Sequence, residues 1–198
     1  PARGAQAAEL KRDADAMLRA WQADPEALGR AAIGLWPANR DGDDLVVWRD
    51  EARREEAARF HALRQQHRAR PGRANLALAD YLAPAPEPDW LGGFVVTAGP
   101  WAERLAARYE AEHDDYRAIL VKALADRLAE AMAEAMHERV RRELWGYAPD
   151  ERLSNEELIA ERYRGIRPAP GYPAFPDHTE KATLFALLDA DALGVTLT

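Results

Sequence analysis

Residues 101–144, WAERLAARYEAEHDDYRAILVKALADRLAEAMAEAMHERVRREL, carry the helical pattern that decides the fold. In the second half of this stretch, apolar residues keep to one stripe of a helix for over twenty residues. The polar step HDDY at 113–116 divides the pattern, so we expect a shorter helix and then a core-spanning one about 40 Å long. The stripe comprises Ile119, Ala123, Leu124, Leu128, Ala131, Met132, Ala135, Met136 and Val140.

The segments before this stretch combine another helix with a predicted β-hairpin. Residues 5–22 have apolar positions at three- and four-residue spacing, which indicates an amphipathic helix. The apolar runs at 31–36 and 45–48 favour two strands, and PANRDGDD at 37–44 supplies turn residues for a longer loop between them.

Three further elements are expected between this hairpin and the long helices. Residues 51–66 are predicted to form a helix, LALADY at 76–81 a short buried strand, and GGFVVTAG at 92–99 another strand. The proline-rich residues 83–89 exclude a helix interior. The buried side of the 51–66 helix is predicted to carry Ala57, Phe60 and Leu63.

Two helix-capping signatures mark the C-terminal part of the chain. Ser154 opens a capping box with Glu157, which predicts a helix reaching to about Tyr163. A second capping pattern at Asp177 predicts a helix through Leu188. No internal repeat or long linker divides the sequence. We therefore predict one α+β domain over residues 1–198, an antiparallel sheet flanked by long helices.

Composition excludes several classes of protein. The 198 residues include 27 Lys and Arg against 34 Asp and Glu, a net charge of −7, which argues against a nucleic-acid partner. The absence of Cys excludes a disulfide framework and any Cys-ligated metal. No apolar run is long enough for a membrane span, and the first residues do not resemble a signal peptide. A cytoplasmic protein with no membrane contact is expected.

No motif for a reacting side chain is present. The five His show neither HxxxH nor HExxH spacing, so no metal site is predicted. The phosphate-binding glycine motifs and the GxSxG nucleophile motif are missing. Ser154 is the only Ser, and its capping role accounts for it. We predict no catalytic residue, and the sequence favours holding a ligand over reacting with one.

The most unusual segment is the proline strap, residues 165–180, which has four prolines and no periodicity. Its prolines fix φ, so a stiff and extended strap is predicted that bears Arg167, Tyr172 and His178. A rigid segment with these side chains is suited to preorganise a small-molecule site. The alternative is a cover over the core, with its aromatic residues simply packed.

Three charged residues have two interpretations each. Arg167 has the planar fork that grips a carboxylate, or it forms a surface salt bridge to Glu157 or Glu161. Asp126 and Glu130 lie four residues apart on one face of the long helix, where one of them can meet a cationic ligand. A solvated charged face is the alternative for that pair.

Longer motifs are more specific. RGIRPAPGYPAFPDHTEKATLF (164–185), WGYAPDERLSNEELIAERY (145–163) and KALADRLAEAMAEAMHERVR (122–141) resemble the activation domain of cobalamin-dependent methionine synthase. LWPANRDGDDLVV (35–47) and NLALADYLAP (75–84) extend the resemblance in the same order, so that it covers most of the chain.

The resemblance implies a module that binds S-adenosylmethionine within a methyltransferase of methionine biosynthesis. In this family the module docks on the cobalamin-binding module when cobalamin has been oxidised to its inactive cob(II)alamin state. Flavodoxin or a similar reductase supplies an electron, and S-adenosylmethionine donates the methyl group that restores methylcobalamin. The family fold is α+β, in agreement with the elements above.

The resemblance also assigns roles to residues. Arg167 looks like the residue that meets the methionyl carboxylate, Ala169 like a backbone contact to the ligand, and Glu130 like the carboxylate that holds the methionyl ammonium. Tyr172 is similar to the tyrosine that approaches the corrin. Asp126 resembles a carboxylate that contacts the displaced histidine ligand of cobalt, and His178 is expected near that interface.

Departures from the family pattern accompany these matches. The chain lacks the family's WTPF-like and GWYF-like segments, so it is interpreted as truncated at both ends. Phe175 stands where the family usually has Cys, and it is expected to pack. The run Arg139, Arg141 and Arg142 predicts a basic patch for flavodoxin, or three arginines placed favourably at a helix C-terminus. The alternative function is a docking scaffold that contacts a corrinoid protein without binding S-adenosylmethionine.

Overall fold

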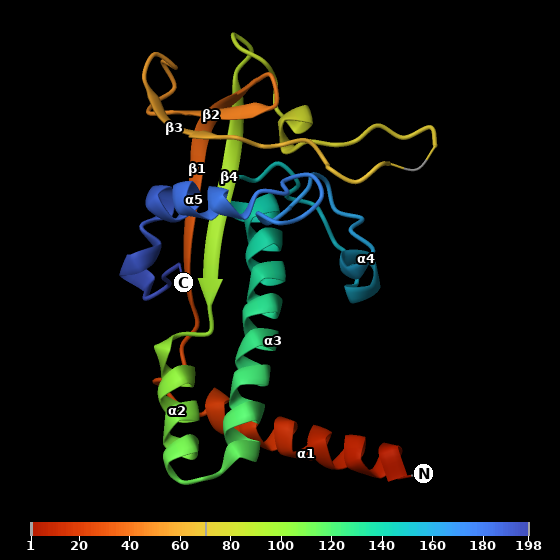
Figure 1. Cartoon of the computed structure of the whole chain (residues 1–198), viewed down its shortest axis with the longest axis vertical. Helices are drawn as coiled ribbons and strands as arrows, with labels where there is room; N and C mark the ends of the chain where they lie inside the picture. The colour runs from red at the N-terminus through yellow and green to blue at the C-terminus, as the bar shows by residue number, and fades with distance from the viewer. Residues whose placement is uncertain (1, 70, 198) are drawn as a thin grey trace. The chain divides into compact units, whose positions relative to one another are not determined.

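The computed structural model describes residues 2–69 and 71–197, and the chain divides into two compact units. Unit 1 contains residues Pro1–Ala31 and Val96–Met136, and unit 2 contains Ala32–Val95 and His137–Thr198. Each unit therefore combines segments from two separate parts of the sequence (Figure 1). Whether residues 1–198 behave as a single domain stays a prediction.

Unit 1 is helical. Helices α1 (Ala2–Gln22), α2 (Pro100–Ala111) and α3 (Asp115–Arg139) confirm the helix predicted over 5–22 and the division of 101–144 near HDDY. Trp21 and Trp101 form the centre of the core, with ring centroids 4.7 Å apart in an edge-to-face arrangement. Val121 of α3 completes the packing against these two rings.

The predicted stripe of α3 is buried only in part. Val140, at the end of the stripe, is buried, whereas Ile119 is 67% exposed and Leu128 is 36% exposed. The face of α3 that packs against the cluster of Trp21 and Trp101 includes Leu124 and Ala125. The prediction of a fully core-spanning stripe is wrong because apolar residues surround much of this alanine-rich helix. Periodicity fixed its extent, and tertiary contacts decided which side is covered.

Unit 2 is built on a four-stranded sheet with strand order β3-β2-β1-β4. The strands are β1 (Arg30–Asp41), β2 (Asp44–Trp48), β3 (Glu56–Phe60) and β4 (Asp89–Thr97), and the ends of β1 and β4 extend into unit 1. The β1–β2 and β2–β3 pairs are antiparallel. Together with the helices, this sheet confirms the α+β fold.

The β1–β2 hairpin is tighter than predicted. The expected loop at 37–44 is wrong because Ala38–Asp41 pair with β2. Asn39 makes this possible, since its buried amide accepts a hydrogen bond from Trp48 Nε1 (2.9 Å) and donates to the carbonyl oxygens of Ala83 and Glu87. The turn itself needs only Gly42, at φ 64°, and Asp43.

Two predicted elements are wrong, and one strand is confirmed. The helix expected over 51–66 is replaced by β3, because Leu45 of β2 pairs with Phe60 and places that ring in the core. Leu63, expected on the buried side, is 49% exposed. Residues Leu78–Tyr81 form a 3₁₀ turn instead of a strand. The strand expected at 92–99 is present as β4.

The C-terminal elements largely follow their capping signals. A π-helical turn, Val140–Leu144, continues α3. Helix α4 (Asn155–Ile159) begins at the predicted Ser154–Glu157 capping box but ends before Tyr163. Helix α5 (Lys181–Leu188) follows a 3₁₀ turn capped by Asp177, and a further 3₁₀ turn spans Ala190–Leu193.

The burial of Phe60 gives a first prediction. Phe60→Ala is expected to lower the free energy of unfolding by about 3–5 kcal/mol, because it leaves a cavity in the unit 2 core. Leu63→Ala, which the 51–66 helix would have made equally costly, is expected to change it by less than about 1 kcal/mol. Urea unfolding measures both. Equal losses for the two variants would contradict the β3 register.

Candidate functional site

The proline strap folds back on itself. The amide of Gly171 donates to the carbonyl of Phe175 (2.8 Å), and the amide of Phe175 donates to the carbonyl of Tyr172 (2.8 Å). A third bond joins the Tyr172 amide to the Ala169 carbonyl (3.0 Å). The extended strap predicted from the sequence is therefore wrong for residues 169–175. Their backbone groups satisfy one another in a closed loop, which we call the strap loop.

Three contacts anchor the strap loop to the rest of unit 2. The Phe175 ring lies in the core with its centroid 6.0 Å from that of Phe60, which confirms the expectation that it packs. The amide of Leu78 donates to the Ala174 carbonyl (2.7 Å). Just after the loop, the carboxylate of Glu180 accepts a hydrogen bond from the His61 amide (3.1 Å). The loop is therefore held on a rigid support.

Both the backbone conformation at position 171 and the closeness of a neighbouring side chain require glycine there. Its φ of 108° lies in the region that favours glycine, and a Cβ at this position would overlap the His178 ring. The His178 ring is thus packed against the strap loop at Gly171. Tyr172, at the tip of the loop, is 62% exposed. The loop presents a phenol to its surroundings while its anchors stay fixed.

The backbone leading into Arg167 is held by an aromatic cluster. The guanidinium of Arg141 is fully buried, pairs with Glu151 at 2.5 Å and lies 4.5 Å from the centroid of the Tyr163 ring. On the same ring, the His137 imidazole makes an edge-to-face contact with centroids 4.8 Å apart. We call these four residues, His137, Arg141, Glu151 and Tyr163, the Tyr163 cluster.

Burial and neighbouring charges keep His137 neutral. Desolvation is the largest cause, and the guanidinium groups of Arg141 and Arg167 add repulsion, so that the pKa of His137 is lowered from 6.5 to about 3. The side chain is 5% exposed. An imidazole at this place therefore brings no positive charge of its own to the neighbourhood of Arg167.

Tyr147 supports the next residues of the chain. Its hydroxyl donates to the Arg164 carbonyl (3.1 Å), and the Arg164 guanidinium donates to the Tyr147 carbonyl (3.4 Å). Gly165 has φ 94°, and a Cβ there would lie 3.1 Å from the Tyr147 hydroxyl. Two residues before Arg167, the backbone is thus restrained on a second ring.

The predicted site residues fall in both units. Arg167, Ala169, Tyr172 and His178 belong to unit 2 and lie on or beside the strap loop. Asp126 and Glu130 are exposed on α3, in unit 1, and share a helix face as expected from their spacing. Their ligand roles stay predictions.

The basic patch predicted for flavodoxin is wrong as stated. Arg141 is buried on Glu151 and cannot face a partner. Arg139 pairs with Glu143 (3.1 Å), and Arg142 pairs with Glu138 (2.6 Å). The arginine triplet therefore divides between the interior and the surface of its helical turn.

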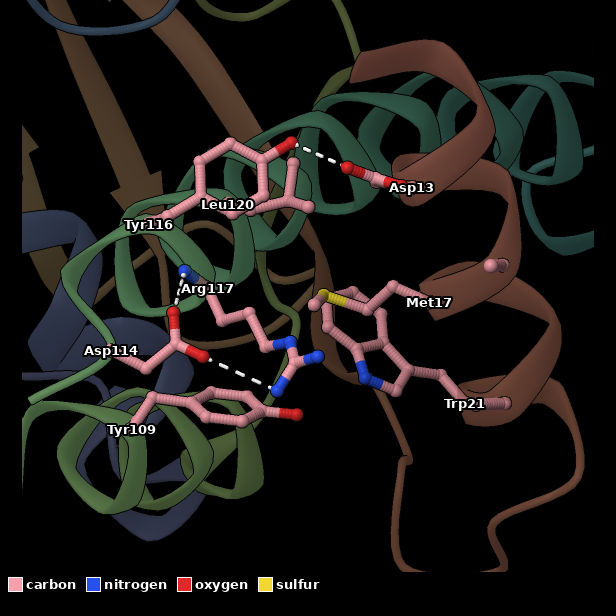
Figure 2. A pocket seen from close by; sticks show the side chains of 10 residues that line it. Asp13, Met17, Trp21, Tyr109, Asp114, Tyr116, Arg117 and Leu120 are labelled. Carbon is pink, nitrogen blue, oxygen red and sulfur yellow. Dashed lines mark hydrogen bonds and ion pairs between the residues drawn. The ribbon is translucent and has the colours of Figure 1, made fainter. Parts of the chain in front are cut away.

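One pocket lies in unit 1 and is lined by none of the strap-loop residues. It has a volume of about 610 Å³ and is bounded by α1, the start of α3 and Tyr109 (Figure 2). Tyr116 donates a hydrogen bond to Asp13 (2.8 Å) across it, and Arg117 pairs with Asp114 (3.2 Å). None of the predicted site residues lines this pocket.

Two kinds of feature are absent from residues 2–69 and 71–197. Within these ranges no group of three or more His, Asp or Glu is arranged to hold a metal ion. The described helices include none that is both long and apolar enough to cross a membrane.

Comparison with known proteins decides the family. The family model for the vitamin B12-dependent methionine synthase activation domain matches residues 1–198. The chain belongs to this activation-domain family. A solved structure described as "Crystal Structure of the MetH Reactivation Domain bound to AdoHcy" is 53% identical, with a TM-score of 0.91 over 98% of this chain. This chain spans 61% of that one.

Sequence reasoning on this activation domain missed the Tyr163 cluster. His137 and Arg141 are four residues apart at the end of a helix, and Glu151 follows beyond a turn, so a shared face was visible in the sequence. Nothing in the sequence indicated burial, because arginine is normally exposed. Only the spacing of His137 and Arg141 could have indicated the cluster, because their residue types do not predict burial.

The buried Arg141–Glu151 pair gives a second prediction. Glu151→Ala is expected to lower the free energy of unfolding of the activation domain by about 3–5 kcal/mol, because a buried guanidinium loses its counter-charge. The matched control is Glu55→Ala, which breaks an exposed pair with Arg49 and is expected to cost about 0–1 kcal/mol. Urea unfolding of both variants is the measurement. A cost at position 151 no larger than at 55 would refute burial of the pair.

His137 gives a third prediction, on pH. Unfolded His binds a proton near pH 6.5 but folded His137 only near pH 3, so its contribution to stability is complete above 6.5 and is lost as pH falls. Between pH 6.5 and 5, the wild-type free energy of unfolding is expected to fall more steeply than that of His137→Phe, by a difference approaching about 1.4 kcal/mol per pH unit. Parallel slopes in urea titrations would contradict a buried neutral imidazole.

Proposed function

We propose that this chain binds S-adenosylmethionine and serves as the reactivation module of a cobalamin-dependent methionine synthase. The observation that carries the proposal is the anchored strap loop, which presents Ala169 and Tyr172 on a rigid support two residues after Arg167. The relative described as bound to AdoHcy supports it, since AdoHcy is S-adenosylmethionine without the transferred methyl group. The methyltransferase activity itself is proposed for the whole enzyme.

Arg167 is the residue proposed to bind the ligand carboxylate. A guanidinium matches a carboxylate with two parallel hydrogen bonds, and a fixed backbone reduces the entropy lost when they form. The Tyr163 cluster and Tyr147 restrain the residues just before it. Ala169 follows on the same backbone, and its carbonyl oxygen is already committed to the Tyr172 amide. Ala169 is proposed as a backbone contact to the ligand.

The remaining roles follow from the resemblance. Glu130 is proposed to hold the ligand ammonium, and its exposure on α3 leaves the carboxylate accessible. Tyr172 at the loop tip and the exposed Asp126 are proposed to face the cobalamin-binding module, with His178 near the same interface. The cobalamin of that module supplies the nucleophilic cobalt. This chain then has only to bind and orient the methyl donor, which agrees with the absence of a reactive motif.

Partners beyond the cobalamin-binding module rest on the resemblance alone. Flavodoxin or a similar reductase is proposed as the electron donor, without the basic patch of Arg139, Arg141 and Arg142 that the sequence suggested. The scaffold alternative, a module that docks without binding S-adenosylmethionine, has no observation in its favour among the described residues.

Calorimetric titration with S-adenosylmethionine tests the proposed function and gives a fourth prediction. Wild type is expected to bind saturably, and Arg167→Ala to weaken binding at least about tenfold through loss of a charged hydrogen-bonded contact. Arg152→Ala, an exposed arginine of the same unit, is the control and is expected to bind like wild type. A folded wild-type chain that does not bind, or an Arg167→Ala variant that binds equally well, would contradict the proposal.

A further inference from the structure

A buried carboxylate lies at the end of the proline strap. Glu180 is only 6% exposed, yet within the described part of the chain one of its carboxylate oxygens, Oε2, has no hydrogen-bond partner. The other oxygen, Oε1, accepts a hydrogen bond from the His61 amide (3.1 Å). A buried carboxylate with an unpaired oxygen lowers stability, because its lost hydration is not fully replaced. The use of this carboxylate therefore has to lie in the oxygen that is bonded.

Helix capping does not account for this side chain. Glu180 is the N-cap residue of α5, but its side chain makes no capping hydrogen bond there. The 3₁₀ turn before α5 is capped instead by Asp177, whose carboxylate accepts from the amide (2.8 Å) and the hydroxyl (2.7 Å) of Thr179. The Glu180 carboxylate thus reaches away from its own helix, to the residue that directly follows β3.

The bond to His61 restrains the 3₁₀ turn His178–Glu180. Asp177 caps the beginning of this turn, and the bond to the His61 amide holds its last residue. The His178 ring belongs to the same turn and packs against Gly171, where a Cβ would overlap the imidazole. The ring therefore stays on the strap loop only while the turn keeps its place.

We propose that Glu180 is a positioning residue for the strap loop. Its bond to the His61 amide sets the turn, and the turn sets the place of the His178 ring. That ring limits the movement of the strap loop, which carries the proposed ligand contact at Ala169. This inference rests on the proposed function, because it concerns the loop of the same site. The site uses the acceptor oxygen of Glu180 and not its charge.

Gly171 is the point of the loop at which an outside restraint matters. Glycine has no side chain to pack, and it loses more conformational freedom on folding than any other residue. The Phe175 ring anchors the end of the loop in the core, whereas Gly171 is held by its bond to the Phe175 carbonyl and by the His178 ring. A loop that is already rigid loses less entropy when the ligand binds. Glu180 therefore acts on affinity without touching the ligand.

Two conservative variants separate the bond from the charge, and give a fifth prediction. Glu180→Gln keeps an acceptor oxygen at the same reach but removes the charge, whereas Glu180→Asp keeps the charge on a side chain one methylene shorter. Calorimetric titration with S-adenosylmethionine is the measurement. Glu180→Gln is expected to bind within about twofold of wild type, and Glu180→Asp at least about fivefold more weakly.

The inference fails if the two variants bind equally well. It also fails if Glu180→Gln binds as weakly as Glu180→Asp, because the charge at the start of α5 would then be what matters.

Val46→Ala is the control for a loss of stability alone. Val46 is buried in β2, and its neighbours Leu45 and Val47, which belong to the core of Phe175, point to the other face of the sheet. This variant is expected to lower the urea midpoint of unfolding but to leave the affinity for S-adenosylmethionine within about twofold of wild type. If it weakens binding as much as Glu180→Asp does, affinity simply follows stability and the inference is overturned.

Amide hydrogen exchange tests the position of the loop without a ligand. The amides of Gly171, Tyr172 and Phe175 donate the bonds that close the strap loop, so their exchange rates report its opening. Glu180→Asp is expected to speed their exchange at least about fivefold, and Glu180→Gln and Val46→Ala less than about twofold. Wild-type rates in Glu180→Asp would overturn the inference. A wild-type chain that binds no S-adenosylmethionine but shows the expected exchange would contradict the proposed function and support the role of Glu180.

A second variant covers the case in which Glu180→Asp does not fold. His178→Ala removes an exposed ring, so the fold is expected to persist, and it takes away the contact at Gly171. Exchange of the Gly171 amide is expected to be at least about fivefold faster than in wild type. An unchanged rate would show that the ring does not restrain the loop, and would overturn the inference.

Discussion

The insertion of Phe175 into the core of unit 2 is the constraint on which the strap loop depends. Its edge-to-face contact with Phe60 ties the loop to β3. Prolines alone would stiffen the segment but would not fix it in place, since they remove hydrogen-bond donors without adding a contact. With the ring buried, the hydrogen bond from the Gly171 amide to the Phe175 carbonyl closes the loop, and Tyr172 is left at its exposed tip.

A second restraint acts before the loop and has a different physical basis. Arg141 is buried at a cost in solvation that Glu151 and the face of Tyr163 offset. Apolar packing of Phe175 therefore holds the part of the strap that follows Arg167. The buried charge of Arg141, with the Tyr163 ring beside it, holds the residues that precede Arg167. Arg167 lies between the two. Such a division lets the backbone stay rigid on both sides of Arg167.

Local signals in the sequence were dependable, and features that depend on distant partners were not. The capping box at Ser154 and the break at 113–116 were correct because each is decided within a few residues. The helix predicted over 51–66 was wrong because pairing with β2 outweighs the helical propensity of that stretch. The buried Arg141 was missed for a similar reason, since its burial requires both Glu151 and Tyr163. The positions of Arg167 and Tyr172 on an anchored loop could be suggested by the prolines but not established by them.

The identity of the anchoring ring has a consequence for oxidation. The chain has no Cys, and its three methionines, Met17, Met132 and Met136, all belong to unit 1, so unit 2 contains no sulfur atom. A thiol in place of Phe175 would become a polar acid wherever peroxide reached it, and such an acid does not fit an apolar core. The phenyl ring has no such reaction. Peroxide therefore leaves the support of the strap loop chemically unchanged.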